Sequence, residues 1–363
     1  MKTHSYLPEI KPARVVKDGE FIFAASHFDH SHIYGQTRGL VAAGGVCKYI
    51  FEPRDELIKP LGGLLDQGTR RVSAFEEILE DPEIHLVTSA AIPNRRCALG
   101  LNVLDAGKDY FTDKSPFTTL EQLEQARSRV RATGRKYSVC YSERLNSESG
   151  WWAGELIRQG ALGRVLQVLN TAPHNLGATG RPDWFFRKEG YGGILTDIGS
   201  HQFEQFLAFS GALDGRVEFA RVENFCHPEH PELEDFGEAA LALDNGCSAY
   251  CRLDWLNPAG LRTWGDGRTF VLGTRGTLEV RKNINVARED GGNRIFLVDG
   301  AGEHEIDCAG KVGHPFFGQL ILDVLNRTEN AMTQAHAFKA AELSMQAQRV
   351  ADARRAKAGF GNA

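Results

Sequence analysis

The feature that most constrains the fold is the alternation of short apolar segments with helical segments between Gly19 and residue 142. Segments such as FIFAAS, HLVTSAA and KYSVCYS are rich in apolar residues and short, which is typical of strands buried on both faces. The stretch NRRCALGLNVLDAG between two of them has the length of a helix and ends at glycine. This alternation predicts a doubly wound parallel sheet, a fold whose ligands bind beyond the carboxyl ends of the strands.

The pattern changes after residue 142. Long alternating segments such as RVEFARVENFCH and RTFVLGTRGTLEVRKN, with turn residues between them, predict antiparallel strands. The last part of the chain has a helical pattern. We therefore expect an N-terminal extension over residues 1–18, a doubly wound α/β domain over 19–141, and an α+β domain with a large, mostly antiparallel open sheet over 142–363.

Composition excludes several classes of protein. The chain is 42% hydrophobic and 25% charged, and its net charge of −5 gives no electrostatic footprint for nucleic acid. It contains no apolar run of about 18 residues, so no membrane span is expected. Its first twenty residues hold no apolar stretch of signal-peptide length, which favours the cytoplasm. The seven cysteines are scattered without zinc-site spacing, which favours free thiols.

The turn after the first predicted strand reads ASHFDH, residues 25–30. A dinucleotide loop normally carries glycines that let the backbone approach a pyrophosphate, and this window has none. Its place between a strand and a helix nevertheless favours a dinucleotide turn built another way, in which the histidines meet phosphate or substrate. The candidate cofactor contacts here are Ser26, His27, Phe28 and His30.

The same stretch has an alternative interpretation as a metal site, since imidazole and carboxylate groups are common metal ligands. His27, Asp29, His30 and His32 supply such groups. Ligands from one turn would crowd each other, and no second cluster in the sequence obviously completes the set. No metal is therefore expected.

Glu52 ends the second predicted strand in IFEPRD. An acid at this position can accept hydrogen bonds from the adenosine ribose hydroxyls and would repel a 2′-phosphate, which favours NAD over NADP. The alternative is that Glu52 is merely the solvated end of a strand.

Lys114 follows the fifth predicted strand in DKSP. The carboxyl end of such a strand lies where a nicotinamide would sit, and an ammonium group there can hold a substrate oxygen and help to move a proton. The alternative is an ordinary surface lysine before a turn proline.

The segment GGILTDIGSH places Asp197 four residues before His201. If a helix begins near Leu195, the two side chains share one face. A histidine can accept a hydroxyl proton near neutral pH, and the aspartate can orient it or hold the substrate. The alternative is a helix-terminal acid beside a structural histidine.

The segment before this motif, residues 171–193, combines hydrogen-bond donors with aromatic side chains, as expected of a lid over a polyol. Its cationic groups could equally hold a substrate carboxylate. The alternative is a loop packed by Trp184 and Phe185. The candidate substrate contacts are His174, Asn175, Arg181 and Trp184, together with His201.

The order and spacing of the turn, Glu52, DKSP and GGILTDIGSH resemble the glucose–fructose oxidoreductase/inositol dehydrogenase (Gfo/Idh/MocA) family. The resemblance covers nearly the whole chain. It implies an NAD-binding Rossmann domain, a second domain for substrate binding and oligomerisation, and assembly as a homodimer or homotetramer. It also implies hydride transfer between nicotinamide and a secondary alcohol of a sugar, cyclitol or sugar-acid-like substrate.

Carried onto this sequence, the resemblance makes Lys114, Asp197 and His201 the catalytic residues, with His201 as general acid/base. It also places Asn94 and Lys114 beside the cofactor. The sequence departs from the family pattern at Asp113, which replaces a glutamate, and at Ser115, which is inserted before Pro116. Two other functions are compatible with this pattern: a lyase or glycoside-cleaving enzyme that uses transient oxidation, and a ligand-binding protein without catalysis.

Overall fold

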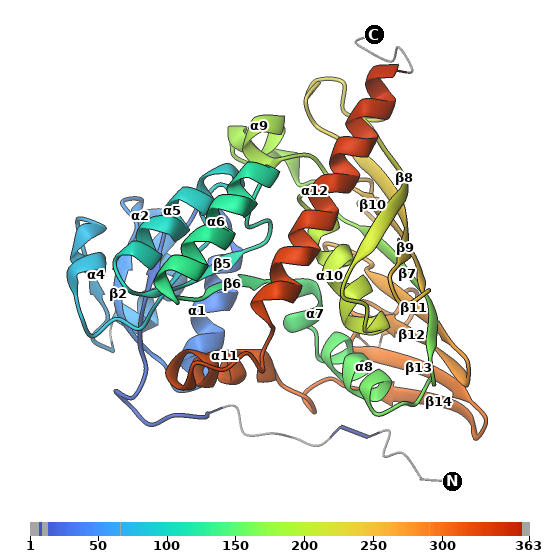
Figure 1. Ribbon diagram of the computed structural model, residues 1–363, viewed down its shortest axis with the longest axis horizontal. Coiled ribbons are helices and arrows are strands. Elements are labelled where there is room, and N and C mark those ends of the chain that lie inside the picture. The colour runs from blue at the N-terminus through green and yellow to red at the C-terminus, as the bar shows by residue number, and fades with distance from the viewer. Residues whose placement is uncertain (1–6, 9–13, 66, 290, 358–363) are drawn as a thin grey trace. The chain divides into compact units, whose positions relative to one another are not determined.

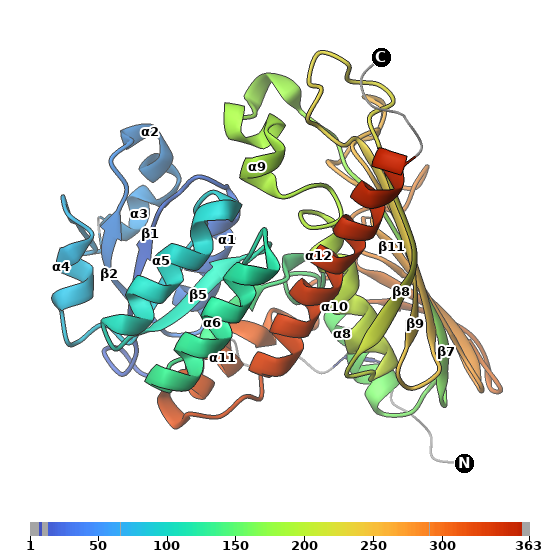
Figure 2. The ribbon, with the colours of Figure 1, turned by 45° about the horizontal axis from the view of Figure 1, so that its top comes forward.

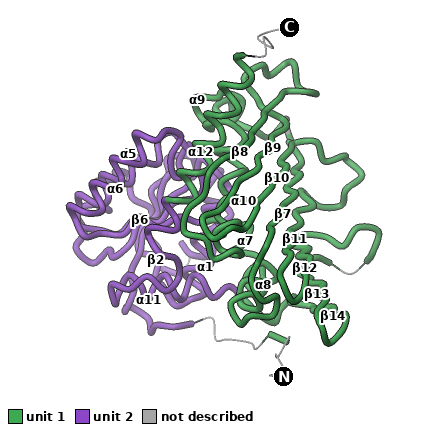
Figure 3. The backbone as a smooth tube through the Cα atoms, turned by 45° about the vertical axis from the view of Figure 1, so that its right-hand side comes forward, with its two compact units in different colours: residues 1–10, 141–313, 339–363 green, residues 11–140, 314–338 purple. Residues whose placement is uncertain are grey.

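The computed structural model describes residues 7–8, 14–65, 67–289 and 291–357 (Figures 1 and 2). The chain forms two compact units (Figure 3). Unit 2 comprises residues 11–140 and 314–338, and unit 1 contains residues 141–313 and the chain from residue 339. Unit 2 thus includes residues 314–338, which the sequence analysis grouped with the second domain. Within the expected N-terminal extension, residues 1–6 and 9–13 lie outside the described residues.

Unit 2 is a parallel six-stranded sheet in the order β3-β2-β1-β4-β5-β6. Helices α5 and α6 cover one face of this sheet, and α1 with α11 covers the other (Figure 2). The strands are β1 (Ile22–Ser26), β2 (Val46–Phe51), β3 (Arg70–Arg71), β4 (Leu86–Ser89), β5 (Asp109–Asp113) and β6 (Tyr137–Cys140). The helices are α1 (His32–Ala42), α2 (Asp55–Ile58), α3 (Gly62–Leu65), α4 (Glu76–Glu80), α5 (Pro93–Asp105), α6 (Leu120–Thr133) and α11 (Pro315–Asn326), with a 3₁₀ turn at Lys59–Leu61.

Local sequence explains these elements. Every residue of β4 and β5 is buried, as their apolar composition predicts for a sheet covered on both faces. Helix α6 begins after Thr119, whose side chain accepts a hydrogen bond from the Gln122 amide, and ends at Gly134 with φ of 65°. Helix α1 lies close to α11 because Gly39 has no side chain: an added Cβ would lie 2.4 Å from the Phe317 ring.

Unit 1 is built on an eight-stranded sheet in the order β14-β13-β12-β11-β7-β10-β9-β8. Neighbouring strands are antiparallel except β7 and β10, which are parallel. The strands are β7 (Val165–Pro173), β8 (Gly215–Glu223), β9 (Phe236–Leu243), β10 (Ser248–Asp254), β11 (Arg268–Gly273), β12 (Gly276–Arg281), β13 (Arg294–Asp299) and β14 (Gly302–Asp307). The predicted combination of a doubly wound α/β unit with a mostly antiparallel sheet is confirmed.

Helices α8 and α10 pack on one face of the eight-stranded sheet (Figure 1). Val168, Asn170 and Ala172 alternate along β7 and are buried, whereas Phe270 and Leu272 on β11 are exposed. The helices of unit 1 are α7 (Ser142–Leu145), α8 (Glu148–Arg158), α9 (Lys188–Tyr191) and α10 (Gly199–Ser210), with 3₁₀ turns at Ala178–Gly180 and Asp183–Phe186. Helix α12 (Gln334–Lys357) begins in unit 2 and continues in unit 1 from residue 339. No helix in the described ranges is long and apolar enough to span a bilayer.

One local prediction is wrong. The helix expected to begin near Leu195 begins at Gly199, so Asp197 lies in the preceding turn and not on the helix. Gly193, with φ of 94°, redirects the backbone, and the Ile194 amide donates to the buried carboxylate of Glu234 at 2.9 Å. These contacts hold residues 194–198 as a turn before α10.

Candidate active site

The order of strands in unit 2 reverses between β1 and β4, which is where doubly wound sheets bind ligands. The turn after β1 is held on both sides: the His27 amide donates to Phe51 O at 3.2 Å, and the His30 amide donates to Ala90 O at 3.0 Å. His27 has φ of 54°, in the left-handed region that usually favours glycine. His27 therefore makes the tight turn that a glycine makes in the usual fingerprint.

Three polar atoms around this turn are buried without a hydrogen-bond partner among the described residues. They are Ser26 Oγ at the end of β1, His27 Nδ1 in the turn, and Asn94 Oδ1 in the first turn of α5. Buried polar groups are nearly always hydrogen-bonded in folded proteins. Each lies at or after the carboxyl end of β1 or β4, the edge at which doubly wound sheets bind ligands, so a polar ligand there would satisfy them.

Glu52 is 1% exposed, so the interpretation as a solvated strand end is wrong. The Phe28 amide donates to its Oε2 at 2.9 Å, and the Arg54 guanidinium donates to both carboxylate oxygens at 2.6 and 2.8 Å. Burial raises the pKa of Glu52, but the hydrogen bonds from Arg54 and Phe28 outweigh it and lower the pKa. Arg54 also pairs with Asp29 at 2.9 Å. No sequence motif marks this cation beside the ribose-binding candidate.

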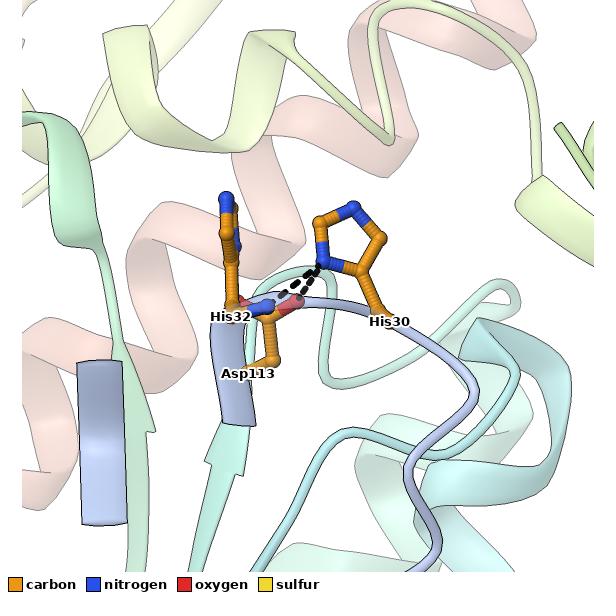
Figure 4. A group of neighbouring side chains, drawn as sticks. All are labelled: His30, His32 and Asp113. Atoms are coloured by element: carbon orange, nitrogen blue, oxygen red, sulfur yellow. Dashed lines mark hydrogen bonds and ion pairs between the residues drawn. The ribbon is translucent and has the colours of Figure 1, made fainter. Parts of the chain in front are cut away.

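Asp113, at the end of β5, lies among cations and imidazoles. His32 Nδ1 lies 2.8 Å from its Oδ1, and His30 Nδ1 lies 3.5 Å from its Oδ2 (Figure 4). The Arg96 guanidinium donates to Oδ2 at 3.2 Å, and both partners are fully buried. Burial raises the pKa of Asp113, but His32 and Arg96 hold the pKa far below its usual range.

His30, His32 and Asp113 supply ligand atoms that lie within 4.8 Å of one another, close enough for a metal ion. However, His30 Nδ1 already accepts a hydrogen bond from the His32 amide at 3.2 Å. The buried Arg96 supplies a positive charge to the same carboxylate, which opposes a second cation. The contacts therefore favour an ionised aspartate that orders the turn, and the expectation of no metal stays a prediction.

The lowered pKa of His30 predicts how the free energy of unfolding depends on pH. Burial lowers this pKa most, His32 lowers it further, and the net value lies well below 6.5. An unfolded chain therefore binds a proton at His30 that the folded chain does not, so stability falls as the pH drops below about 6.5. We expect the variant His30→Gln to lose less unfolding free energy than the wild type between pH 7 and pH 5, measured by urea denaturation.

The exposed His314→Gln variant controls for the loss of one imidazole. If the free energy of unfolding of His30→Gln depended on pH as in the wild type, His30 would not be the buried neutral group whose protonation destabilises the fold.

Lys114 is 5% exposed, so it is not an ordinary surface lysine. Its carbonyl accepts a hydrogen bond from Arg96, which also donates to Ser115 O at 3.1 Å and to Ala91 O at 2.6 Å. Arg96 thereby joins the loop after β4 to the loop that carries Lys114. Arg96 was not predicted from the sequence, because no local pattern marks a helix residue as the partner of two distant loops.

In unit 1, the motif residues Asp197 and His201 are 6% and 3% exposed. Ser200 Oγ donates to Asp197 O at 2.8 Å and ties the turn to the start of α10. The His201 ring meets the Tyr141 ring edge-on, with centroids 6.4 Å apart. The structure thus holds a buried histidine and a buried aspartate at one end of α10.

A buried polar network lies beside His201. Glu143 Oε2 accepts from Gln202 at 2.8 Å and from Lys282 at 3.2 Å, and Lys282 donates to Gln205 at 2.7 Å. Burial raises the pKa of Glu143, but Lys282, His201 and His174 hold the pKa far below its usual range. Lys282 carries no sequence signal for this role, because only the sheet brings it to Glu143.

The predicted substrate segment is ordered by aromatic contacts. His174 donates from Nδ1 to Ala172 O at 3.0 Å, and its ring lies 5.3 Å from that of Trp255 and 4.8 Å from that of Trp264. The Arg181 guanidinium lies 4.2 Å from the centre of the Phe185 ring. The Trp184 and Phe185 rings lie 5.8 Å apart, so these two residues also pack the loop.

Comparison with known proteins decides the family. The model of the GFO/IDH/MocA C-terminal domain matches residues 152–279. A solved structure from Erwinia carotovora, of a protein classed among the oxidoreductases, is 44% identical, with 92% of this chain and 99% of that chain covered and a TM-score of 0.87. The chain belongs to the Gfo/Idh/MocA family.

More distant family relatives have assigned names. D-xylose dehydrogenase of Paenarthrobacter nicotinovorans is 26% identical over 132 residues, so the chain matches about a third of that curated relative's length (34%) and 35% of its own. Levoglucosan dehydrogenase, solved with NADH and levoglucosan, is 16% identical with a TM-score of 0.76 over 92% of this chain and 98% of that one. At that identity the second likeness concerns the fold alone.

Proposed function

We propose that this Gfo/Idh/MocA protein is an NAD-dependent oxidoreductase that acts on a secondary alcohol of a sugar or cyclitol. The observation that carries the proposal is the group of partnerless buried atoms at the sheet reversal, Ser26 Oγ, His27 Nδ1 and Asn94 Oδ1. The family supports the same conclusion, since its named relatives here are a xylose and a levoglucosan dehydrogenase.

The residues around the turn after β1 fit a dinucleotide. The turn leads directly into α1, whose first turn carries no acidic side chain, so no carboxylate of that turn repels an anion from the positive end of the helix dipole. Glu52 is ionised and follows β2, and in this proposal the ribose hydroxyls take the place of the Arg54 guanidinium on its carboxylate. When bound, NAD supplies the carbon that accepts the hydride. The residues of this chain position the alcohol and move its proton.

In this proposal His201 takes the hydroxyl proton as general base. Lys114 polarises the alcohol oxygen as it gains carbonyl character, and Asp197 orients the substrate or the histidine. Their burial supports the assignment, because removal of water strengthens electrostatic contacts to a developing charge.

The cofactor assignment predicts a thermal shift. Cofactor-stripped protein should melt at a higher temperature with NAD⁺ or NADH, because a ligand at about 100 times its Kd adds about 2.7 kcal/mol to the folded state. Glu52→Gln should reduce this shift. Arg54→Ala leaves the Glu52 carboxylate in place, so it tests whether Glu52 itself or its guanidinium partner governs NAD binding.

A larger shift with NADP(H) than with NAD(H) would reverse the cofactor preference and assign Arg54 to a 2′-phosphate. If none of NAD⁺, NADH, NADP⁺ and NADPH raised the melting temperature, the proposed dinucleotide turn would be contradicted.

A further inference from the structure

Unit 1 has an open hollow of about 540 Å³ formed by two loops. One loop follows β7 and contributes Asn175 and Arg181, and the other, residues 261–264, contributes Arg262 and Trp264. The loops are joined through the backbone: the Asn175 amide donates to Trp264 O at 2.6 Å. The two walls of the hollow are thus held together.

The charge of this hollow is positive. Its lining contains two arginines and no acidic residue. Arg181 donates to Leu176 O at 2.9 Å and Arg262 to Asn285 O at 3.1 Å, and within the described residues neither has a carboxylate at ion-pair distance. By contrast, Arg187 in the same loop segment pairs with Glu232 at 2.8 Å. Guanidinium groups that form no internal ion pair can bind an external carboxylate or phosphate through two donors at once.

One wall of the hollow is aromatic. The Trp264 side chain is 50% exposed, which is unusual for so large an apolar ring. Its ring contacts the His174 ring, which orients it. A fixed indole beside two cations fits a ligand with one apolar face and one anionic group, as a sugar ring with an acidic substituent has.

A chain of side-chain contacts connects the hollow to the buried network beside His201. The Arg181 guanidinium lies over the Trp255 ring, 5.1 Å from its centre, and Trp255 contacts His174. His174 Nε2 lies 3.6 Å from Glu143 Oε1 in the buried network beside His201.

We propose that Arg181 and Arg262 bind the anionic group of the substrate while Trp264 covers the sugar ring, so that the substrate is an acidic sugar, carrying a carboxylate or a phosphate. This inference rests on the proposed function and specifies its substrate class. It assigns a specificity role to Arg262 and Trp264, which no sequence motif marks.

The test is isothermal titration calorimetry of the full chain without cofactor. The probes are glucuronate, galacturonate and gluconate as carboxylates, glucose 6-phosphate as a phosphate, and glucose and galactose as neutral references. We expect at least one anionic probe to bind roughly tenfold more tightly than the neutral sugars, and this preference to weaken with added salt. The anion class that binds more tightly, carboxylate or phosphate, identifies the acidic group that the hollow binds.

Variants separate the hollow from general charge. Arg262→Gln should remove most of the preference for the anion, as should Arg181→Met, which keeps an apolar side chain near Phe185 and Trp255. Arg275→Gln is the matched control, because Arg275 is also exposed, also donates to a backbone carbonyl, Gly160 O at 2.6 Å, and lies outside the hollow.

The inference would be overturned if anionic and neutral sugars bound equally well, or if no anionic sugar bound. It would also be overturned if Arg262→Gln kept the preference for the anionic sugar. Failure of the proposed function is a separate result. If the protein preferred anionic sugars but did not reduce NAD⁺ with them, the anion-binding role of the hollow would stand and the oxidoreductase assignment would not.

Discussion

Replacing Lys114 with methionine is expected to lower kcat/KM by roughly 10²–10⁴-fold, the usual contribution of a positioned proton-transfer group. His201→Gln should cause a loss of the same order. Both residues are almost fully buried, and a buried group acts more strongly on a developing charge than one in water. The measurement is NADH formation in steady-state kinetics, with NAD⁺ affinity followed by calorimetry. Affinity for NAD⁺ should change only a few-fold.

Lys108→Met is the matched control for Lys114→Met. Lys108 is also buried, but it precedes β5 and therefore lies at the opposite end of the same strand. The folded control should retain turnover. Near-wild-type turnover in both Lys114→Met and His201→Gln would remove these residues from the catalytic assignment.

Replacing Arg96 with methionine is expected to lower the free energy of unfolding by about 3–5 kcal/mol, because it leaves a buried carboxylate without its buried cation. Arg96 and Asp113 are both fully buried, and Arg96 also satisfies the carbonyls of Ala91 and Ser115. Urea denaturation measures the loss. Turnover per folded molecule should fall too, since Arg96 holds the loop of Lys114.

The double variant Arg96→Met/Asp113→Asn separates the charge from the packing. It should recover part of the lost stability, because the unpaired carboxylate is gone. A loss below about 1 kcal/mol in Arg96→Met, as for an exposed ion pair, would show that the pair is not desolvated as the structure indicates.

The residues themselves determined much of the fold. The strand–helix alternation up to residue 142 predicted the parallel sheet, and the stretch NRRCALGLNVLDAG predicted helix α5. These signals are local, because hydrophobic periodicity and capping depend on residues a few positions apart. The turn after β1 was recognised by its place between a strand and a helix, although His27 stands where glycine is usual.

Only the tertiary structure decided which groups surround the candidate catalytic residues. Arg96 reaches the loop of Lys114, Lys282 reaches Glu143, and residues 261–264 meet the loop after β7 to form the hollow. The position of Asp197 before α10 also depended on a distant group, the carboxylate of Glu234. Each of these contacts joins residues far apart in the chain, and their geometry arises from strand order and helix packing, which no local pattern encodes.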